Sequence, residues 1–138
     1  MAALVTSREV EYAVRDVLTE RGYELSIARN HGETGADIVA KKGDDVILVE
    51  AIAFKSSPPA RAKDFYESFF RAVSRIAPTK ALCAIALPAR FGMGLHQRAR
   101  AIGIAWKRIG TAFPELKIWL VDTENGSINQ TSWNSWYD

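Results

Sequence analysis

The sequence predicts an α/β fold with a mixed sheet flanked by helices, and three observations lead to this prediction. Segments whose apolar residues recur at helical spacing alternate with short apolar runs that are typical of strands. Two of these runs, residues 81–87 and 117–121, are apolar without alternation, as expected for strands covered on both faces. The connections are short, so consecutive elements are expected to pack as neighbours. The expected order is α-β-β-β-α-β-α-β in one domain, residues 1–138, with a C-terminal hairpin or tail from about residue 123.

The composition is that of an ordinary soluble protein. The chain has 138 residues, of which 48% are hydrophobic and 25% charged, and this is enough for one core. The formal net charge of +2 permits a nucleic-acid partner without requiring one. The single cysteine, Cys83, lies in an apolar run and is expected to be a buried, unreactive thiol. We find no signal peptide and no apolar stretch long enough to cross a bilayer, so we expect a cytoplasmic protein with no membrane partner.

The N-terminal half is expected to form one helix and three strands. Thr6 and Glu9 have the spacing of a capping box that opens a helix. The apolar residues of this helix form one stripe, made of Val10, Ala13, Val14, Val17 and Leu18. Strands are predicted at residues 23–29, 37–41 and 46–54, and the polar turn between the last two predicts an antiparallel hairpin.

The C-terminal half is expected to contain two helices and two strands. Ser57 and Pro58 have the residue types that open a helix, which the apolar pattern extends to about residue 76. A single long helix is predicted after the strand at 81–87, from an apolar stripe that continues through Gly103. This stripe consists of Leu95, Ala99, Ile102, Trp106, Ile109 and Phe113.

The last segment of the chain is expected to return along the sheet. The pair Asn125-Gly126 is typical of a tight turn, and it leads to a short edge strand at residues 127–131. The tail that follows is polar with three aromatic residues. It packs either on the core of its own chain or on a second subunit, and the sequence does not decide between them.

Two isolated carboxylates lie in strand-like sequence. Asp37 opens the run 37–41, and Glu50 lies in the middle of the run 46–54. Burying a carboxylate costs free energy unless a cation or a metal pairs with it. Two carboxylates on neighbouring strands, followed by a lysine, suggest a metal-dependent phosphodiesterase site. The alternatives are a simple strand-start carboxylate at Asp37 and a structural ion pair between Glu50 and a lysine or arginine.

The order of elements, together with short motifs on two strands, resembles the PD-(D/E)XK nuclease superfamily, and within it the Mrr-like restriction endonucleases and Holliday-junction resolvases. The motifs are Gly35-Ala36-Asp37-Ile38 and Val49-Glu50-Ala51, with Glu11 in the first helix and Gly22-Tyr23 after it, and the resemblance covers roughly residues 4–122. It implies a restriction-endonuclease-like fold, DNA as the partner and a homodimer as one possible assembly.

The resemblance also implies a metal-dependent endonuclease reaction. Asp37 and Glu50 would hold Mg²⁺ or Mn²⁺, the carbonyl of Ala51 would be a third ligand, and Glu11 would be an additional ligand or a supporting group. In such enzymes a lysine two residues after the glutamate stabilises the anionic transition state.

The sequence departs from the family pattern at this lysine, because the position two residues after Glu50 is Ile52. Residues two apart on a strand share a face, so an apolar side chain is expected where the ammonium group should be. Lys55, swung round by a bulge, and Lys63 on the following helix are the two candidates for a displaced catalytic lysine. The alternative is a catalytically inactive relative that binds nucleic acid or a protein.

Basic residues provide a candidate nucleic-acid surface. His96, Arg100 and Lys107 fall on one face of the predicted long helix, and Arg61 belongs to a basic group on the helix before it. Such residues form either an ordinary solvated surface or contacts to phosphates. We predict His31, Arg61, Arg100 and Lys107 as nucleic-acid-binding residues. His31, in the polar loop of the N-terminal half, is either a substrate contact or a surface side chain.

Overall fold

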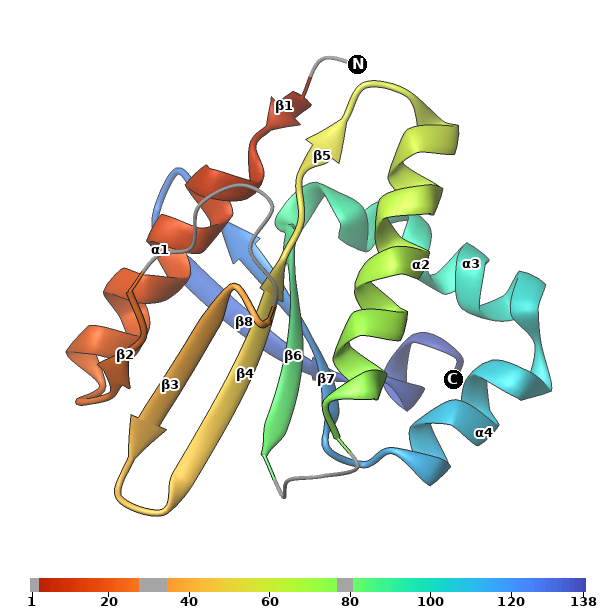
Figure 1. Cartoon of the computed structure of the whole chain (residues 1–138). Helices are drawn as coiled ribbons and strands as arrows, with labels where there is room; N and C mark the ends of the chain where they lie inside the picture. Colours follow the sequence, from red (N-terminus) through yellow and green to blue (C-terminus); the bar gives the residue numbers. More distant parts are fainter. Residues whose placement is uncertain (1–2, 28–34, 77–80) are drawn as a thin grey trace.

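A computed structural model describes residues 3–27, 35–76 and 81–138, and its centre is a six-stranded sheet (Figure 1). The strand order is β2-β3-β4-β6-β7-β8, in which β4, β6 and β7 are parallel and the other neighbours are antiparallel. The strands are β2 (Glu24–Leu25), β3 (Ile38–Lys42), β4 (Asp45–Ala51), β6 (Leu82–Pro88), β7 (Leu116–Asp122) and β8 (Ser127–Ser132). This mixed sheet confirms the predicted fold class.

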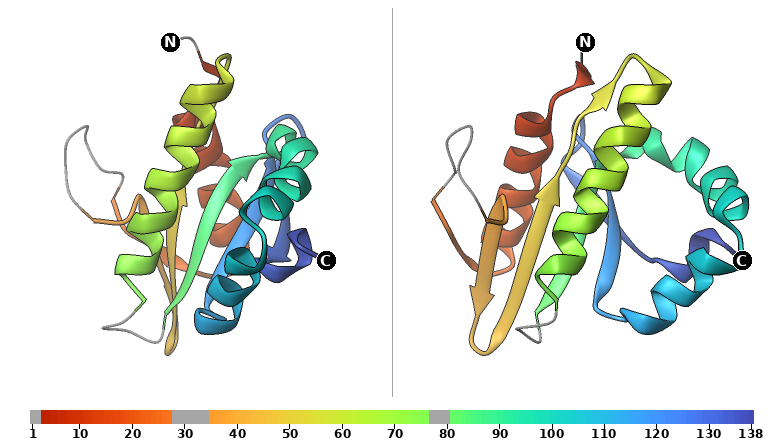
Figure 2. Two further views of the ribbon diagram at one scale, coloured as in Figure 1. Left: turned by 90° about the vertical axis from the view of Figure 1, so that its right-hand side faces the viewer. Right: turned by 45° about the vertical axis from the view of Figure 1, so that its right-hand side comes forward.

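Helices cover both faces of the sheet, and Figure 2 shows the resulting layers. Helix α1 (Ser7–Glu20) packs on one face, against a cluster that includes Ile38, Val49 and Trp119. The other face carries α2 (Pro58–Ser74), α3 (Gly92–Ile102) and α4 (Ile104–Ala112), packed on Ile85, Leu87 and Ile118. Strand β6 lies between the two layers and is buried on both faces, as its unbroken apolar run predicts.

The hairpin of β3 and β4 was predicted, but the second strand is shorter than expected. The register pairs Ile38 with Val49, and the turn contains Gly43 at φ +59°. Strand β4 ends at Ala51, and the chain then leaves the sheet, so that β5 (Phe54–Lys55) pairs with β1 (Ala3–Val5) in a separate two-stranded sheet. The predicted strand at 46–54 is therefore wrong in its last three residues.

Both predicted helix starts are confirmed by their capping contacts. The hydroxyl of Thr6 accepts a hydrogen bond from the amide of Glu9 at 3.1 Å, and that of Ser57 accepts one from Ala60 at 3.4 Å. Helix α1 buries Val10, Val14 and Leu18 on the predicted stripe. The predicted strand at 23–29 is too long, because only β2 is a strand and residues 23, 26 and 27 are not, while residues 28 and 29 lie outside the described residues.

The prediction of one long helix through Gly103 is wrong. Gly103 adopts φ +79° and ψ −146°, which ends α3 and begins α4. The apolar stripe breaks at the same point, because Leu95 and Trp106 are buried whereas Ile102 is 37% exposed. The face predicted to carry His96, Arg100 and Lys107 is consequently divided between two helices.

The C-terminal segment forms the predicted edge strand and then packs on its own chain. Strand β8 pairs antiparallel with β7, and Trp133 and Trp136 join the core beneath α3 and α4. The indoles of Trp106 and Trp133 stack with centroids 4.0 Å apart, and each donates a hydrogen bond to the other residue's carbonyl, at 2.7 and 2.8 Å. The alternative left open by the sequence is thus decided in favour of the core.

Two simpler predictions concern Cys83 and membranes. Cys83 is 1% exposed, which confirms that its side chain is buried, and burial raises the pKa of its thiol to about 11, which favours the unreactive form. Among the described helices, none combines the length and the hydropathy that crossing a bilayer requires.

Gly110→Ala is expected to destabilise the protein by about 1–2 kcal/mol because it overpacks the junction between α4 and the C-terminal segment. A Cβ at position 110 would clash with Oδ1 of Asn134 and lie 3.0 Å from Cδ1 of Trp133. Gly94→Ala in α3 is the control, since a Cβ there meets no atom within 4 Å among the described residues, and alanine is favoured in a helix. Urea unfolding should show opposite signs for the two variants, and equal gains would contradict the packing described here.

Candidate active site

Asp37 lies immediately before β3, and its carboxylate reaches the neighbouring strand. Its Oδ2 accepts a hydrogen bond from the amide of Ala51 at 2.8 Å. Burial raises the pKa of Asp37 above its ordinary value, and the negative charge of Glu11 acts in the same direction. The Ala51 amide and the more distant guanidinium groups of α2 only partly offset this effect. Asp37 is therefore a carboxylate that would gain from a nearby cation.

Glu50 lies on β4 and is 5% exposed. The strand register, continued by one residue beyond the pair of Ile38 and Val49, sets Glu50 opposite Asp37. Its neighbours Val49 and Ala51 pack on the α1 side, so the alternation of the strand turns Glu50 toward α2. There Nη1 of Arg75, at the C-terminal end of α2, donates to Oε1 of Glu50. The ion pair proposed as an alternative for Glu50 is thus present in the structure.

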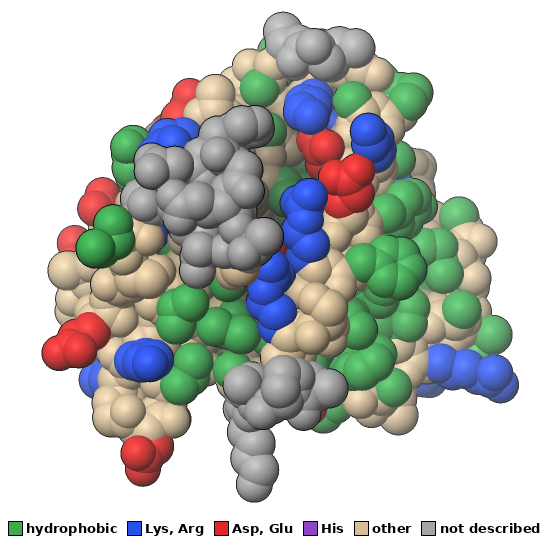
Figure 3. Space-filling model, in the orientation of Figure 1, with side chains coloured by type: hydrophobic (Ala, Val, Ile, Leu, Met, Phe, Trp, Pro, Cys, Tyr) green, Lys and Arg blue, Asp and Glu red, His purple; other side chains and the backbone are tan. Residues whose placement is uncertain are grey.

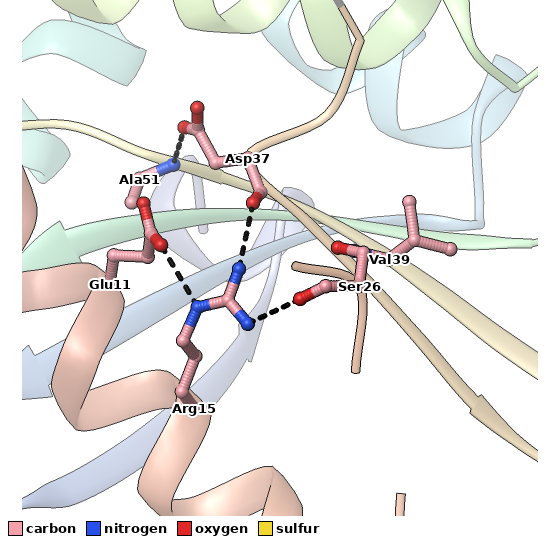
Figure 4. Close-up of polar contacts among 6 residues, drawn as sticks. All are labelled: Glu11, Arg15, Ser26, Asp37, Val39 and Ala51. Atoms are coloured by element: carbon pink, nitrogen blue, oxygen red, sulfur yellow. Dashed lines mark hydrogen bonds and ion pairs between the residues drawn. The ribbon is translucent and has the colours of Figure 1, made fainter. Parts of the chain in front are cut away.

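Glu11 is held beneath Asp37 by an arginine of its own helix (Figure 4). Nε of Arg15 lies 2.9 Å from Oε2 of Glu11, and both side chains are at most 16% exposed. The same guanidinium donates to the carbonyl oxygens of Ser26, at 2.6 Å, and Asp37, at 3.3 Å. Arg15 therefore ties α1 to the segments on either side of residues 28–34, and through them it fixes the start of β3.

Ile52, two residues after Glu50, places an apolar side chain in the core. It is 7% exposed and belongs to the core cluster on the α2 side, as period-two alternation from Glu50 predicts. Its amide donates to the carbonyl of Ala86 at 3.1 Å. Position 52 therefore supplies no positive charge to the candidate site.

The two lysines considered as replacements are paired with acids of α2. Nζ of Lys55 lies 2.9 Å from Oδ2 of Asp64, and Nζ of Lys63 lies 3.9 Å from Oε1 of Glu67. The side chain of Lys63 is 74% exposed, and twelve residues separate it from Arg75, which corresponds to about 18 Å along a helix. Lys63 therefore lies far from Asp37 and Glu50, and the ammonium group of Lys55 contacts Asp64.

The basic residues of α2 lie on the same side of the molecule as this site. Figure 3 shows lysine and arginine side chains in a column along the middle of this face, with acidic side chains at its upper end. Arg71 is exposed and pairs with Glu67, whereas Arg75 reaches the buried Glu50. Sequence reasoning included Arg71 and Arg75 in the basic group of this helix without linking them to the acidic residues, and it missed Arg15, because no local pattern distinguishes these from other surface arginines.

The predicted nucleic-acid residues are dispersed. Arg61 stacks on Phe54, with its guanidinium carbon 4.4 Å from the ring centroid. Arg100 on α3 and Lys107 on α4 are exposed and share no face, for the reason given above. His31 lies outside the described residues.

The residues present fit a magnesium-type ion when the backbone is included. Within residues 3–27, 35–76 and 81–138, no three His, Cys, Asp or Glu side chains are grouped as a metal site. The register, continued beyond Ile38 and Val49, sets Asp37 opposite Glu50, and the Asp37 carboxylate contacts the backbone of Ala51, the next residue. Two carboxylates and a carbonyl are the oxygen ligands that Mg²⁺ takes together with water. Glu11 is engaged by Arg15 and supports this group from below.

Comparison with known proteins shows a family to which part of the chain is similar. Residues 3–64 match the family model described as restriction endonuclease. The matched segment contains Glu11, Asp37, Glu50 and Ala51, and it ends before Arg75. Neither the curated proteins nor the solved structures gave a match.

Proposed function

We propose that the protein is a metal-dependent endonuclease that hydrolyses phosphodiester bonds of DNA, since residues 3–64 match the restriction endonuclease family model and the chain resembles the PD-(D/E)XK nucleases. The observation that carries the proposal is the contact of the Asp37 carboxylate with the Ala51 amide, directly opposite Glu50. This contact links the residue before β3 to the end of β4, which supports a site shared by the acidic motifs of the two strands. The burial that raises the pKa of Asp37 favours a bound cation there.

The ligands in this proposal are Asp37, Glu50 and the carbonyl of Ala51. A bound Mg²⁺ or Mn²⁺ supplies a water of lowered pKa and compensates charge on the scissile phosphate. Asp37 is held for this role by the Ala51 amide, and its backbone is held by Arg15. Glu11 acts as a positioning residue, because it fixes the guanidinium that contacts the Asp37 carbonyl.

Arg75 takes the place of the missing lysine in this proposal. Ile52 offers no charge, whereas Arg75, within the described part of the chain, is a cation that contacts Glu50. A guanidinium beside the metal ligands can donate to an anionic phosphate as the transition state forms. Lys55 and Lys63 are weaker candidates, because Asp64 and Glu67 engage their ammonium groups.

Cleavage of supercoiled plasmid and branched DNA tests the activity. Wild-type protein is expected to nick DNA with Mg²⁺ or Mn²⁺ and to lose this activity in EDTA, and Asp37→Ala is expected to be inactive because a metal ligand is lost. Asp44→Ala is the matched control, since Asp44 lies exposed in the hairpin turn. Equal background nicking by the wild type and by Asp37→Ala would refute the enzymatic proposal.

The alternative function is a non-catalytic module that binds nucleic acid or a protein partner. One observation favours it, namely that Arg75 already compensates the charge of Glu50 without a metal. A gel shift in EDTA at low and high salt separates the two functions. Salt-dependent DNA binding without any cleavage would favour the module, and absence of binding at low salt would favour a protein partner.

DNA is the partner that both the family and the basic face of α2 favour. Two other expectations from the sequence, a homodimer and a cytoplasmic location, stay predictions.

A further inference from the structure

A cavity of about 330 Å³ is lined by residues other than those of the candidate active site. Its walls are formed by three arginines, Arg61, Arg90 and Arg98, and by the rings of Phe54 and Phe91. Arg90 and Phe91 belong to the 3₁₀ helix η1 (Ala89–Phe91), and the first turn of α3 completes the lining. Among the described residues, no acidic side chain lines this cavity.

Two of the arginines are held by stacking on one aromatic ring. The guanidinium carbons of Arg61 and Arg90 lie 4.4 and 4.7 Å from the centroid of Phe54. Phe91 supports this ring edge-on, with centroids 5.1 Å apart. Stacking fixes the plane of a guanidinium and leaves its N–H edges available for an anion. Arg61 uses one nitrogen on the carbonyls of Lys55 and Ser56, which anchors it further.

Arg98 lies against two aromatic rings of α2. Its guanidinium lies 5.4 Å from the ring centroid of Phe65 and 5.6 Å from that of Tyr66. Its hydrogen bond to the Tyr66 hydroxyl is long, at 3.4 Å, and its buried Nε has no acceptor among the described residues. Arg98 therefore keeps its charge with little internal compensation.

The charge of this cavity is unbalanced within the described part of the chain. Arg15, Lys55, Lys63, Arg71 and Arg75 each have a carboxylate partner, whereas Arg61, Arg90 and Arg98 have none among the described residues. Three like charges around one cavity repel one another unless an anion lies between them. No side chain caps the first turn of α3. The partial positive charge at this end of the helix adds to the positive charge of the three arginines.

We propose that this cavity binds a phosphate group of a nucleotide strand. Guanidinium groups match the geometry of phosphate oxygens, and the apolar wall of Phe91 and the 90% exposed Met93 suits the attached nucleoside. Phe54 follows Glu50 by four residues, so the cavity lies on the segment that leaves the candidate active site. The choice of DNA as the strand rests on the proposed function, and the phosphate chemistry rests on the cavity alone.

The test is fluorescence anisotropy of short labelled DNA in EDTA, so that binding is measured without cleavage. Arg90→Gln is expected to weaken binding about tenfold, the effect of losing one charge-assisted hydrogen bond, and to reduce the salt slope by about 1. Arg98→Gln is expected to act in the same direction. Arg108→Gln, an exposed arginine on α4, makes the same charge change away from the cavity and is expected to alter binding less than twofold.

The source of the phosphate is distinguished by the ligands compared. If a 5′-phosphorylated strand binds more tightly than its 5′-hydroxyl form and Arg90→Gln removes the difference, the cavity takes a terminal phosphate. If Arg90→Gln weakens both forms equally, it takes a backbone phosphate. Inorganic phosphate that binds as tightly as DNA would overturn the assignment to a strand.

The outcome that overturns the whole proposal is equal DNA binding by Arg90→Gln and Arg108→Gln. Because Arg90 is exposed on a short 3₁₀ helix, its substitution is expected to leave the fold intact, and thermal melting checks this. An inactive protein whose binding still depends on Arg90 would refute the nuclease proposal and retain the cavity. A protein that cleaves DNA and binds it independently of Arg90 would support the nuclease proposal and refute the phosphate site in the cavity.

Discussion

Arg75→Ala is expected to lower the free energy of unfolding by about 3 kcal/mol in EDTA, because it removes one member of a buried ion pair. Glu50 is 6% exposed at its side chain and Arg75 is 22% exposed, so water compensates the remaining charge poorly. Urea unfolding measures the change. Arg71→Ala is the matched control on the same helix, since the pair of Arg71 with Glu67 is exposed and worth at most about 1 kcal/mol.

Mg²⁺ should restore part of the lost stability in Arg75→Ala, because a cation at Asp37 and Glu50 replaces the compensation that Arg75 supplies. The gain on adding Mg²⁺ is expected to be larger for this variant than for the wild type. Cleavage by the variant should fall by about 10²–10³-fold, the effect of losing one transition-state contact. If Arg75→Ala is as stable as Arg71→Ala and cleaves normally, Arg75 has neither role.

Asp37→Asn is expected to abolish cleavage and yet to stabilise the protein at pH 7 in EDTA. Burial raises the pKa of Asp37 above 3.8, so the folded protein binds this proton more tightly than the unfolded chain does. The stability that this group contributes is therefore full below the ordinary pKa and is lost as the pH rises through the raised one. Asparagine does not ionise and can still accept the hydrogen bond from the Ala51 amide.

The stability difference between Asp37→Asn and the wild type should consequently shrink as the pH falls below the ordinary pKa of aspartate. Urea unfolding of both proteins at a series of pH values measures it. Added Mg²⁺ should also reduce the difference at pH 7, because a cation stabilises the charged carboxylate. Asp44→Asn, in the exposed turn, is the control and is expected to give no such gain. A less stable Asp37→Asn at pH 7 would contradict the role of burial.

The acidic pair could be predicted because the signals that place it are local. The alternation along each strand and the polar turn at Gly43 determine the register, and the register sets Asp37 opposite Glu50. The fold class follows from similar signals, since the unbroken apolar run of β6 requires helices on both faces.

The elements that sequence reasoning missed depend on contacts between distant segments. The pairing of β1 with β5 joins residues about fifty positions apart, and neither strand is long enough to show a pattern. The apolar stripe continues at helical spacing on both sides of Gly103, so only the backbone conformation of Gly103 shows that one helix ends and another begins there. Arg75 reaches Glu50 because α2 runs back across β4, and the search for a cation near Glu50 along the sequence led to Lys55 and Lys63 instead.

The paired indoles of Trp106 and Trp133 give the protein a built-in optical reporter. Two rings stacked 4.0 Å apart, with a third ring, Phe65, 6.2 Å from one and 6.1 Å from the other, are fixed in a chiral environment. Near-ultraviolet circular dichroism and tryptophan fluorescence will therefore follow the docking of residues 133–136 as well as the folding of the sheet. A chain shortened after Ser132 would lose this signal and uncover Trp106, so tags placed at this end should leave the last helical turn in place.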